Sequence, residues 1–425
     1  MINLDNLKSL FVDLIKEVYL IIVNLTYRYH ERLEGTNTKV KKKKLVFVIG
    51  FPVSNYRVIK RILTEQRLTC DITLLFQDKN IGEAERLKKQ FPQLKIINVQ
   101  KFKNLLNFGL REIASADLLV CDNYYPFLAG LPRKRQMKIF QIWHASGAIK
   151  TFGFGDKRVE KRNALARYRY QKVYDTFDYY FVGSDGMAKV FENSFKAKSE
   201  QMLKLGYPRS DVLLNPSEMA RRHDKAQEKL NMINGRRVIL YVPTYRESTV
   251  HQDNRLDVET LYQTLHKDYI FIYRAHPAAR QNLKQQFKKM ARYPDFFITN
   301  NSGFSLVDCL SITDVLISDY SSVVFDYMLL NGKGRLMLYC YDFDYYESTK
   351  GVQAHFIEKF PSRICLNSQE LIQQIKSEEI IDFTELNQIW NTYNDGQATS
   401  RVVDYLQTIL EASDNTDAHQ SSQAV

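Results

Sequence analysis

The chain contains few cysteines, and they form no recognisable metal or disulfide pattern. Five cysteines occur in 425 residues, without a CxxC motif and without a histidine at metal-ligand spacing. This scatter argues against a zinc or iron–sulfur site. We expect reduced, buried thiols in a cytosolic compartment, at Cys70, Cys121, Cys309, Cys340 and Cys365.

The sequence also lacks a membrane-spanning segment. It contains no run of about 20 uncharged apolar residues, the length that crosses a bilayer as a helix. The apolar core VYLIIV near the N-terminus is too short, and no small-residue cleavage site of a signal peptide accompanies it.

The first 44 residues nevertheless indicate contact with a membrane surface. The basic segment KVKKKK, with Lys39 and Lys41 to Lys44, follows a stretch with apolar residues at helical three- and four-residue steps. Together they predict an amphipathic helix and a polybasic segment over residues 1–44, which attach peripherally to an anionic membrane. The alternative is a helix packed on the protein's own core. The apolar positions are Leu4, Leu7, Phe11, Leu14, Val18, Ile22 and Leu25.

Acidic residues are in deficit. The chain has 48 aspartates and glutamates against 60 lysines and arginines, a net charge of +12. This charge predicts an anionic partner: nucleic acid, anionic lipid or a phosphorylated substrate. No RNP, helix-turn-helix or zinc-finger pattern occurs, so we expect no nucleic-acid partner. No pair or cluster of carboxylates indicates a magnesium site, and we expect no protein-held metal.

Short apolar runs alternate with charged helical stretches, which predicts parallel sheets covered by helices on both faces. We expect two doubly wound α/β domains, at 45–215 and 216–411, and a disordered polar tail at 412–425. The charged helix before Asn-Gly at 234–235 leads into the second domain. The expected strands are 45–50, 72–76, 95–99, 118–122, 139–143 and 179–183, then 237–243, 269–274, 296–299, 314–319 and 335–340.

Ligands of such sheets bind beyond the carboxyl ends of the strands, so residues at those ends are candidates for a site. His144 follows the strand IFQIW, and Ala145, Ser146 and Gly147 leave room for a backbone to approach a phosphate. A neutral imidazole can accept a proton from a hydroxyl nucleophile. Lys150 can bind phosphate. Taken alone, the motif favours a buried core histidine over a catalytic one, since histidine is often buried without a catalytic role.

Two further motifs end strands in the second half. In YVPTYRE, the strand ends at Pro243 and presents Thr244 and Arg246, whose guanidinium matches phosphate oxygens. In YRAHP, Arg274 is followed by His276, which precedes a proline and is therefore biased away from helical geometry. A solvated arginine after a strand is the alternative in the first case.

The stretch DVLISDYSSVVFDYMLL is the most specific of these motifs. A buried strand ends at Asp319, and Ser321 and Ser322 open a helix. Free N–H groups and hydroxyls at a helix start can bind a diphosphate, although a serine there can also simply cap the helix. Asp326 lies one turn along, where its carboxylate could accept hydrogen bonds from ribose hydroxyls.

In this order, WHASGAIKTFG, YVPTYR, RAHP and ISDYSSVVFDYMLL closely resemble the motifs of the CDP-glycerol glycerophosphotransferases that build teichoic acids in Gram-positive bacteria. The resemblance covers roughly residues 115–345, and YPRSD at 207–211 also fits. Family members often carry WHGTPLK where this chain has WHASGAIK, so the histidine and the lysine are kept. The family implies a two-domain GT-B fold.

The resemblance also implies roles for individual residues. His144 matches the family's proposed general base, and His276 a residue that stabilises the donor diphosphate or the departing CMP. Thr244 and Arg246 match donor-phosphate contacts, Ser321 and Ser322 diphosphate ligands, and Asp326 a ligand of ribose or glycerol hydroxyls. We also count Lys150, Arg274 and Asp319 as substrate-binding candidates, and we expect no cofactor.

The implied reaction moves glycerol phosphate from CDP-glycerol to a hydroxyl of an undecaprenyl-diphosphate-linked saccharide, with release of CMP. The implied location is peripheral, at the cytoplasmic face of the membrane. Family chains of this length without a long N-terminal extension resemble primases, so we expect the priming step. The alternatives are a processive poly(glycerol phosphate) polymerase, a CDP-ribitol-using relative and a GT-B glycosyltransferase that uses a sugar nucleotide.

Overall fold

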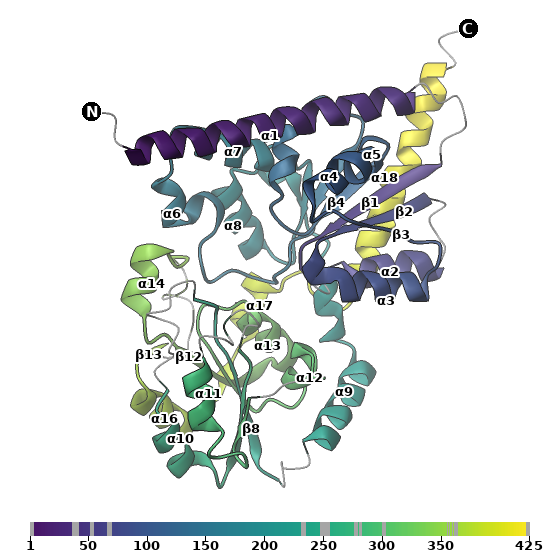
Figure 1. The fold of residues 1–425 in the computed structure, drawn as a ribbon. Coiled ribbons are helices and arrows are strands. Elements are labelled where there is room, and N and C mark those ends of the chain that lie inside the picture. Colours follow the sequence, from purple (N-terminus) through teal and green to yellow (C-terminus); the bar gives the residue numbers. More distant parts are fainter. Residues whose placement is uncertain are drawn as a thin grey trace.

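The computed structural model shows two α/β domains, one above the other in Figure 1, each built on a parallel sheet. The residues that it describes are 4–35, 42–51, 55–65, 70–230, 235–246, 256–275, 279, 283–299, 303–354, 356, 358, 360 and 364–421.

In the described part of the N-terminal domain, seven parallel strands form a sheet of order β3-β2-β1-β4-β5-β6-β7. Every strand predicted in this half is present, with bounds shifted by no more than two residues. The two-residue strand β7 was not predicted, because it is too short to show a periodic pattern. The strands are β1 (Lys43–Ile49), β2 (Cys70–Phe76), β3 (Lys95–Asn98), β4 (Leu118–Cys121), β5 (Lys138–Gln141), β6 (Tyr179–Phe181) and β7 (Met202–Leu203).

Helices cover both faces of this sheet, because its central strands are apolar on both sides. In β1, Leu45 and Phe47 pack with α2 (Tyr56–Glu65), α3 (Ile81–Gln90) and α18 (Ala398–Ser421). Val46 and Val48 point to the other face and pack with a second set of helices. That set contains α1 (Leu4–Gly35), α5 (Leu110–Ala114), α7 (Ala164–Tyr174) and α8 (Asp185–Phe195). The short helices α4 (Phe102–Asn104) and α6 (Lys157–Glu160) complete the domain.

The C-terminal domain repeats this plan with the strand order β10-β9-β8-β11-β12-β13 and β14 antiparallel to β12. The five predicted strands are again present within two residues, whereas the short β13 and β14 were not predicted. The strands are β8 (Arg237–Val242), β9 (Tyr269–Tyr273), β10 (Phe297–Ile298), β11 (Val315–Ser318), β12 (Lys333–Tyr339), β13 (Ile364–Cys365) and β14 (Ile381–Asp382).

One face of this sheet packs with α10 (Val258–Leu265), α11 (Lys284–Met290) and α16 (Ser368–Lys376). The other packs with α9 (Pro216–Lys229), α12 (Leu306–Leu310), α13 (Val323–Asn331) and α17 (Thr384–Trp390). The helix α14 (Phe343–Thr349) lies at the edge nearest the N-terminal domain (Figure 1). The connecting helix α9 begins where expected, because the Asn215 side chain accepts from the Glu218 N–H and Pro216 occupies the first turn.

The C-terminal segment differs from the sequence-based domain boundaries. Residues 398–411 were assigned to the second domain, but α18 crosses back and packs on the N-terminal sheet. Val402, Val403, Leu406 and Leu410 belong to the same core cluster as the α2 residues. The helix continues to Ser421, into the range that was expected to form a disordered tail. The N-terminal domain is therefore closed by the last helix of the chain.

The helix α1 lies across the N-terminal domain with an unusual orientation (Figure 1). Only a narrow stripe, including Leu20, Val23 and Tyr27, is buried against the domain. An ion pair between Asp13 and Arg169 of α7 holds the helix in place, and Asn163 donates to the same carboxylate over 2.6 Å. Polar side chains of α1 thus take part in the contact with the domain.

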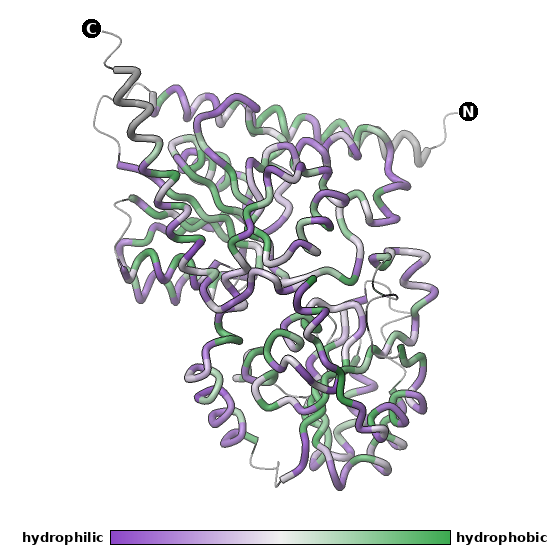
Figure 2. The backbone as a smooth tube through the Cα atoms, turned by 180° about the vertical axis from the view of Figure 1, so that it is seen from behind, coloured by the Kyte–Doolittle hydropathy of each residue, from purple (hydrophilic) through white to green (hydrophobic). Residues whose placement is uncertain are grey.

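The predicted apolar face of α1 is exposed instead of packed on the core. Phe11 is 63% exposed and Leu25 is 62% exposed, and Leu14, Val18 and Ile22 are also exposed. Figure 2 shows hydrophobic and hydrophilic residues alternating along the helix. Exposed Leu165 and Tyr168 of the neighbouring α7 extend the apolar surface. A row of large exposed apolar side chains is characteristic of an interaction surface.

Lys39 and Lys41 of the basic segment lie outside the described residues. Lys43 and Lys44 belong to β1, where they form ion pairs with Asp117 and Glu112. No helix among the described residues has the length and hydropathy needed to cross a bilayer. All five cysteines are free thiols, and all except Cys70 are buried.

Candidate active site between the two domains

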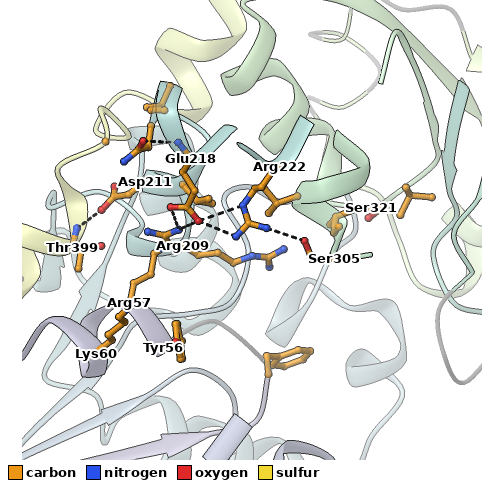
Figure 3. Close-up of a pocket in the computed structure, with 18 of the residues that line it drawn as sticks. Tyr56, Arg57, Lys60, Arg209, Asp211, Glu218, Arg222, Ser305, Ser321 and Thr399 are labelled. Carbon is orange, nitrogen blue, oxygen red and sulfur yellow. Dashed lines mark hydrogen bonds and ion pairs between the residues drawn. The ribbon is translucent and has the colours of Figure 1, made fainter. Parts of the chain in front are cut away.

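A cleft of about 1550 Å³ separates the domains at the carboxyl ends of both sheets. Its N-terminal wall comes from α2, α3 and the loop after β1, and its C-terminal wall from the loops after β8 and β9 and the start of α13. Figure 3 shows Tyr56, Arg57 and Lys60 on α2, with Ser305 and Ser321 of the other domain across from them. A cleft therefore lies where the strand ends predicted one, and substrate binding in it stays a prediction.

His144 lies three residues beyond β5, because that strand ends earlier than predicted. The Gln141 side chain accepts from the Trp143 N–H over 3.0 Å, which turns the backbone out of the sheet. Trp143 itself has a φ of +61°, a left-handed conformation that is rare for a bulky residue. Its ring packs on Phe152, Phe191 and Phe195. The packing around Trp143 therefore fixes the position of the His144 backbone just beyond the sheet.

Hydrogen bonding sets the tautomer of His144. Its Nδ1 lies 2.8 Å from the backbone oxygen of Asp122, which can only accept, so Nδ1 carries the proton. Burial, together with the nearby charges of Lys150, Arg209 and Lys79, lowers the pKa of His144 to about 3, although the bond to the Asp122 backbone acts in the opposite direction. The ring is therefore neutral at neutral pH, and Nε2 holds a free lone pair. This is the protonation state that a general base needs.

Phe51 and Asp122 hold the other side of this ring. The Phe51 ring stacks on His144 with a centroid separation of 3.7 Å. The buried Asp122 carboxylate accepts from the backbone N–H groups of Gly50 and Phe51, at 2.8 and 3.0 Å, and from the Tyr125 hydroxyl at 2.7 Å. Asp122 thus ties the loop after β1 to the loop after β4, and through Phe51 it positions His144.

Lys150 lines the cleft beside His144. Burial lowers the pKa of its ammonium group to about 8, and the positive charge of Lys350 lowers it further, whereas Asp319 raises it. Its backbone is fixed by a bridge to Val352 of the C-terminal domain. The loop is joined to that domain again where Gln353 N–H donates to Ile149 O over 2.7 Å. Lys150 is therefore a partly desolvated cation, placed as a phosphate ligand requires.

The small residues after His144 have a different use from the one predicted. We expected Ser146 and Gly147 to leave space for a phosphate, but both are buried against α13 of the other domain. The Ser146 hydroxyl donates to Asp326 over 2.6 Å. A Cβ on Gly147 would lie 2.6 Å from the Phe325 ring, so this position has no room for a side chain. These residues form the contact between the domains.

Asp326 was predicted to bind ribose or glycerol hydroxyls, but the structure buries it in this same contact. Arg209 lies 3.8 Å from its second carboxylate oxygen and donates to the His144 backbone oxygen over 3.3 Å. Burial raises the pKa of Asp326, while Arg209 and Ser146 act in the opposite direction. Ser146, Asp326 and Arg209 together connect the His144 loop to α13.

Arg209 explains why the YPRSD stretch accompanies the other motifs. Residues Pro208–Val212 form a short 3₁₀ helix after β7, and Arg209 points from it into the cleft. Asp211 accepts from the N–H groups of Ala398 and Thr399 at 3.0 and 2.7 Å, which caps α18. The sequence reasoning did not name Arg209 as a site residue. The one sequence feature that could have pointed to Arg209 was the occurrence of YPRSD together with the other family motifs.

Arg246 was predicted to bind donor phosphate and Asp319 to bind substrate, but the structure pairs them with each other. Arg246 Nη1 lies 2.8 Å from Asp319, and its Nε lies 2.8 Å from Asp342. All three side chains are buried. Asp319 also accepts from the Thr244 N–H over 2.8 Å. This network supports the loop after β8, and it leaves Thr244 at the cleft surface with its Oγ1 unpaired.

Ser321 and Ser322 open a helix, as predicted. The helix α13 starts at Val323, and its N-cap residue Ser322 makes no side-chain capping hydrogen bond. Ser321 lines the cleft. The Ser321 hydroxyl thus lies at the cleft surface beside the start of α13, where it also accepts from the Val323 N–H over 3.4 Å.

Arg274 also lines the cleft and donates to Phe304 O over 3.0 Å. His276 lies outside the described residues, so its predicted role stays a prediction. No three histidine, cysteine or carboxylate side chains gather as a metal site in the part of the chain that is described.

The fold and the position of the cleft define the class of protein. Two Rossmann-like domains that face each other at their carboxyl ends form the GT-B architecture of nucleotide-dependent transferases. A solved structure of the wall teichoic acid polymerase TagF superposes with a TM-score of 0.69 at 19% identity, covering 97% of this chain and 99% of that chain. This likeness confirms the predicted fold.

The sequence identifies the family within this class. Residues 35–408 match the CDP-Glycerol:Poly(glycerophosphate) glycerophosphotransferase family, and the chain belongs to that family. It is 28% identical to the teichoic acid glycerol-phosphate primase of Bacillus subtilis, covering 87% of this chain and 93% of that one. It is 26% identical to the teichoic acid ribitol-phosphate primase of Bacillus spizizenii, covering 84% and 92%. The protein is therefore an enzyme of teichoic acid biosynthesis, as the motifs indicated.

Proposed function

We propose that this enzyme transfers glycerol phosphate from CDP-glycerol to a hydroxyl of a lipid-linked saccharide and releases CMP. The acceptor oxygen attacks the β-phosphorus of CDP-glycerol, a new P–O bond forms, and the bond to the bridging diphosphate oxygen breaks. Negative charge spreads over the phosphoryl oxygens and the departing CMP, so the reaction needs a base, a fixed geometry and cations.

The observation that supports this proposal best is the state of His144. Its Nδ1 proton is used by the Asp122 backbone, its ring is neutral, and its Nε2 can accept the proton of the acceptor hydroxyl. The proton leaves the oxygen as the P–O bond forms. Phe51 and Trp143 fix the ring from its two sides, which reduces the entropy lost at the transition state.

The donor diphosphate is proposed to bind at the start of α13. Ser321 and Ser322 offer their hydroxyls there, and Lys150 and Arg274 supply positive charge from the two sides of the cleft. His276, carried over from the family motif, would stabilise the departing CMP. Because phosphoryl transfer depends on preorganised positive charge, these groups can lower the barrier without covalent chemistry.

The test is CMP release from CDP-glycerol in the presence of a prenyl-diphosphate-linked disaccharide. We expect His144→Ala to lower kcat by about 10²- to 10⁴-fold, the usual contribution of a general base. His223→Ala is the matched control, because His223 lies on α9 and is partly exposed outside the cleft. A His144→Ala enzyme with unchanged turnover and intact circular dichroism would exclude His144 as the base.

The same assay distinguishes the alternative donors and products. The relative from Bacillus spizizenii is named for ribitol phosphate, so CDP-ribitol and UDP-sugars are compared with CDP-glycerol at equal concentration. Mass spectrometry of the lipid product then separates priming from polymerisation. A single added glycerol phosphate supports the primase, and a ladder of products identifies a polymerase.

The exposed apolar face of α1 supports attachment to the membrane that carries the acceptor. Phe11, Leu14, Val18 and Leu25 form a continuous row on a helix that Asp13 and Arg169 fix to the domain. Side chains of this kind insert into the interface between lipid headgroups and acyl chains.

Flotation with vesicles of anionic and neutral lipid tests this attachment. Removal of α1 is unsuitable, because Leu20, Val23 and Tyr27 are part of the core. We expect Phe11→Glu with Leu25→Glu to abolish flotation of the full chain. The matched control is Leu366→Glu with Ile380→Glu, which changes two exposed apolar residues of the C-terminal domain. Equal flotation of both variants would refute attachment through α1.

A further inference from the structure

The N-terminal wall of the cleft carries a group of cations that the site described above does not use. The helix α2 directs Arg57, Lys60 and Arg61 toward the cleft, and α3 adds Arg86. Positions 57, 60, 61 and 64 form one helical face, while Val58, Ile59, Ile62 and Leu63 on the opposite face are buried in the core. We call these four cations the α2 wall.

Two members of the α2 wall are already neutralised. Arg57 donates to both carboxylate oxygens of Glu218, at 3.0 and 3.1 Å, and Arg61 lies 2.9 Å from Glu65. Figure 3 shows Arg57 reaching from α2 to Glu218 and Arg222 at the rim of the cleft. Glu218 also accepts from Arg222, which in turn binds Asp308 at 2.6 Å. These two arginines therefore have structural partners.

The other two members, Lys60 and Arg86, make no ion pair with any residue that the structure describes. Both are exposed on the cleft side. The Arg86 guanidinium lies over the Tyr56 ring at 4.6 Å, a contact that fixes the group and leaves its charge uncompensated. Two cations without an ion-pair partner in the described part of the chain, both facing a substrate cleft, are suited to bind an anion.

The position of the α2 wall favours the acceptor over the donor. The donor cradle lies on the C-terminal domain, at Ser321 and Ser322. The α2 wall is on the other domain and follows the loop after β1, whose Phe51 stacks on His144. The acceptor hydroxyl must reach His144, and the α2 wall belongs to the same domain as His144.

We infer that Lys60 and Arg86 bind the diphosphate group of the acceptor. This inference rests on the proposed function and adds a subsite to it. A saccharide diphosphate presents oxygens to both cations while its sugar hydroxyl extends toward His144. The ligand class is thus a diphosphate diester that joins the acceptor saccharide to its lipid.

The test uses two acceptors with the same disaccharide, one linked to a short prenyl diphosphate and one to a neutral alkyl chain. For Lys60→Gln with Arg86→Gln, we expect the KM of the diphosphate acceptor to rise about tenfold, as two partly exposed charge contacts would give. The KM of the neutral acceptor and of CDP-glycerol should stay unchanged. Lys89→Gln with Lys376→Gln removes two exposed charges outside the cleft and is the control.

Binding of the diphosphate compound to the resting enzyme, measured by calorimetry without CDP-glycerol, gives a second readout. Weaker binding to the Lys60 and Arg86 variant supports the subsite even where no transfer is detected. An equal rise in KM for both acceptors, a raised KM for CDP-glycerol, or unchanged binding of the diphosphate compound would each overturn the inference. Absence of transfer by the unaltered enzyme with both acceptors refutes the proposed function alone.

Discussion

The Ser146 hydroxyl and the Asp326 carboxylate form a hydrogen bond of 2.6 Å that joins the two domains. Ser146 lies two residues after His144, and Asp326 lies in the first turns of α13, just after Ser321 and Ser322. The bond therefore links the proposed base to the proposed donor cradle. Its geometry sets how far apart these two groups lie.

We predict that Ser146→Ala lowers both stability and turnover. The change leaves the buried Asp326 carboxylate without its hydroxyl partner, a loss of about 1–3 kcal/mol in the free energy of unfolding. We expect kcat to fall while the KM for CDP-glycerol changes little. Urea unfolding and steady-state kinetics of Ser146→Ala, Asp326→Asn and the double variant measure the coupling. If the effects of the two single variants add up to the effect of the double variant, the two residues act separately. That result would support a role for Asp326 as a substrate ligand, without Ser146.

The pKa of Lys150 predicts a basic limb in the pH profile. Burial and Lys350 lower this pKa to about 8, so the ammonium group loses its proton as the pH rises through that value. We expect kcat/KM for CDP-glycerol to fall above that pH, because the neutral amine no longer attracts phosphate. His144, with a pKa near 3, contributes no acid limb near neutral pH.

Lys150→Arg tests the assignment of this limb, because arginine keeps its charge throughout the accessible range. The basic limb should disappear in this variant, even where the absolute activity is lower. A limb that persists at the same pH would assign the titration to another group.

Asp122 is predicted to act on His144 without touching the substrate. In Asp122→Asn, one of the two backbone N–H groups at Gly50 and Phe51 loses its carboxylate acceptor, and the Phe51 ring is released from His144. We expect a lower kcat, an unchanged KM for CDP-glycerol and a His144 pKa that moves up toward its ordinary value. NMR titration of the His144 ring measures this pKa. Phe51→Leu should reproduce the pKa change, and a pKa that stays low in both variants would contradict the positioning role.

Arg246 is predicted to be more important for stability than for phosphate binding. Arg246→Ala leaves Asp319 and Asp342 buried without their cation, which should cost about 3–5 kcal/mol in the free energy of unfolding. Arg246→Lys keeps the positive charge but loses the planar guanidinium that contacts both carboxylates, so it should recover only part of this stability. Chemical denaturation compares the two variants. A stable Arg246→Ala protein with a raised KM for CDP-glycerol would instead support the phosphate contact predicted from the sequence.

The longer strands and the location of the cleft could be predicted from sequence because both depend on local patterns. Apolar runs such as LVFVIG are continuous and are bounded by charged stretches, and polar residues after them mark the carboxyl ends. The pairing of side chains across the domains depends on tertiary contacts that have no sequence signature. Arg246, Asp326 and the return of α18 to the first sheet belong to this second group.

The orientation of α1 also depends on tertiary contacts that the sequence does not reveal. The periodicity of its apolar residues correctly predicted a helix, but apolar residues lie both on its buried side and on its exposed side. Which side meets the domain is decided by Asp13, Arg169 and Asn163, whose contacts join residues about 150 positions apart. The side of α1 that meets the domain therefore combines Asp13 with the apolar Leu20, Val23 and Tyr27, and the row from Phe11 to Leu25 faces outward.

Asp122 and Asp319 occupy equivalent places in the two sheets, each directly after the strand that pairs with the first strand of its domain. Each carboxylate binds backbone N–H groups of the loop that follows that first strand. The contacts that position the proposed base therefore lie within the N-terminal domain, and those that shape the proposed nucleotide pocket lie within the C-terminal domain. If the domains separate to admit substrate, neither set of contacts has to be rebuilt, and the contacts between the domains, among them the Ser146–Asp326 bond and the Lys150–Val352 bridge, have to re-form before each turnover.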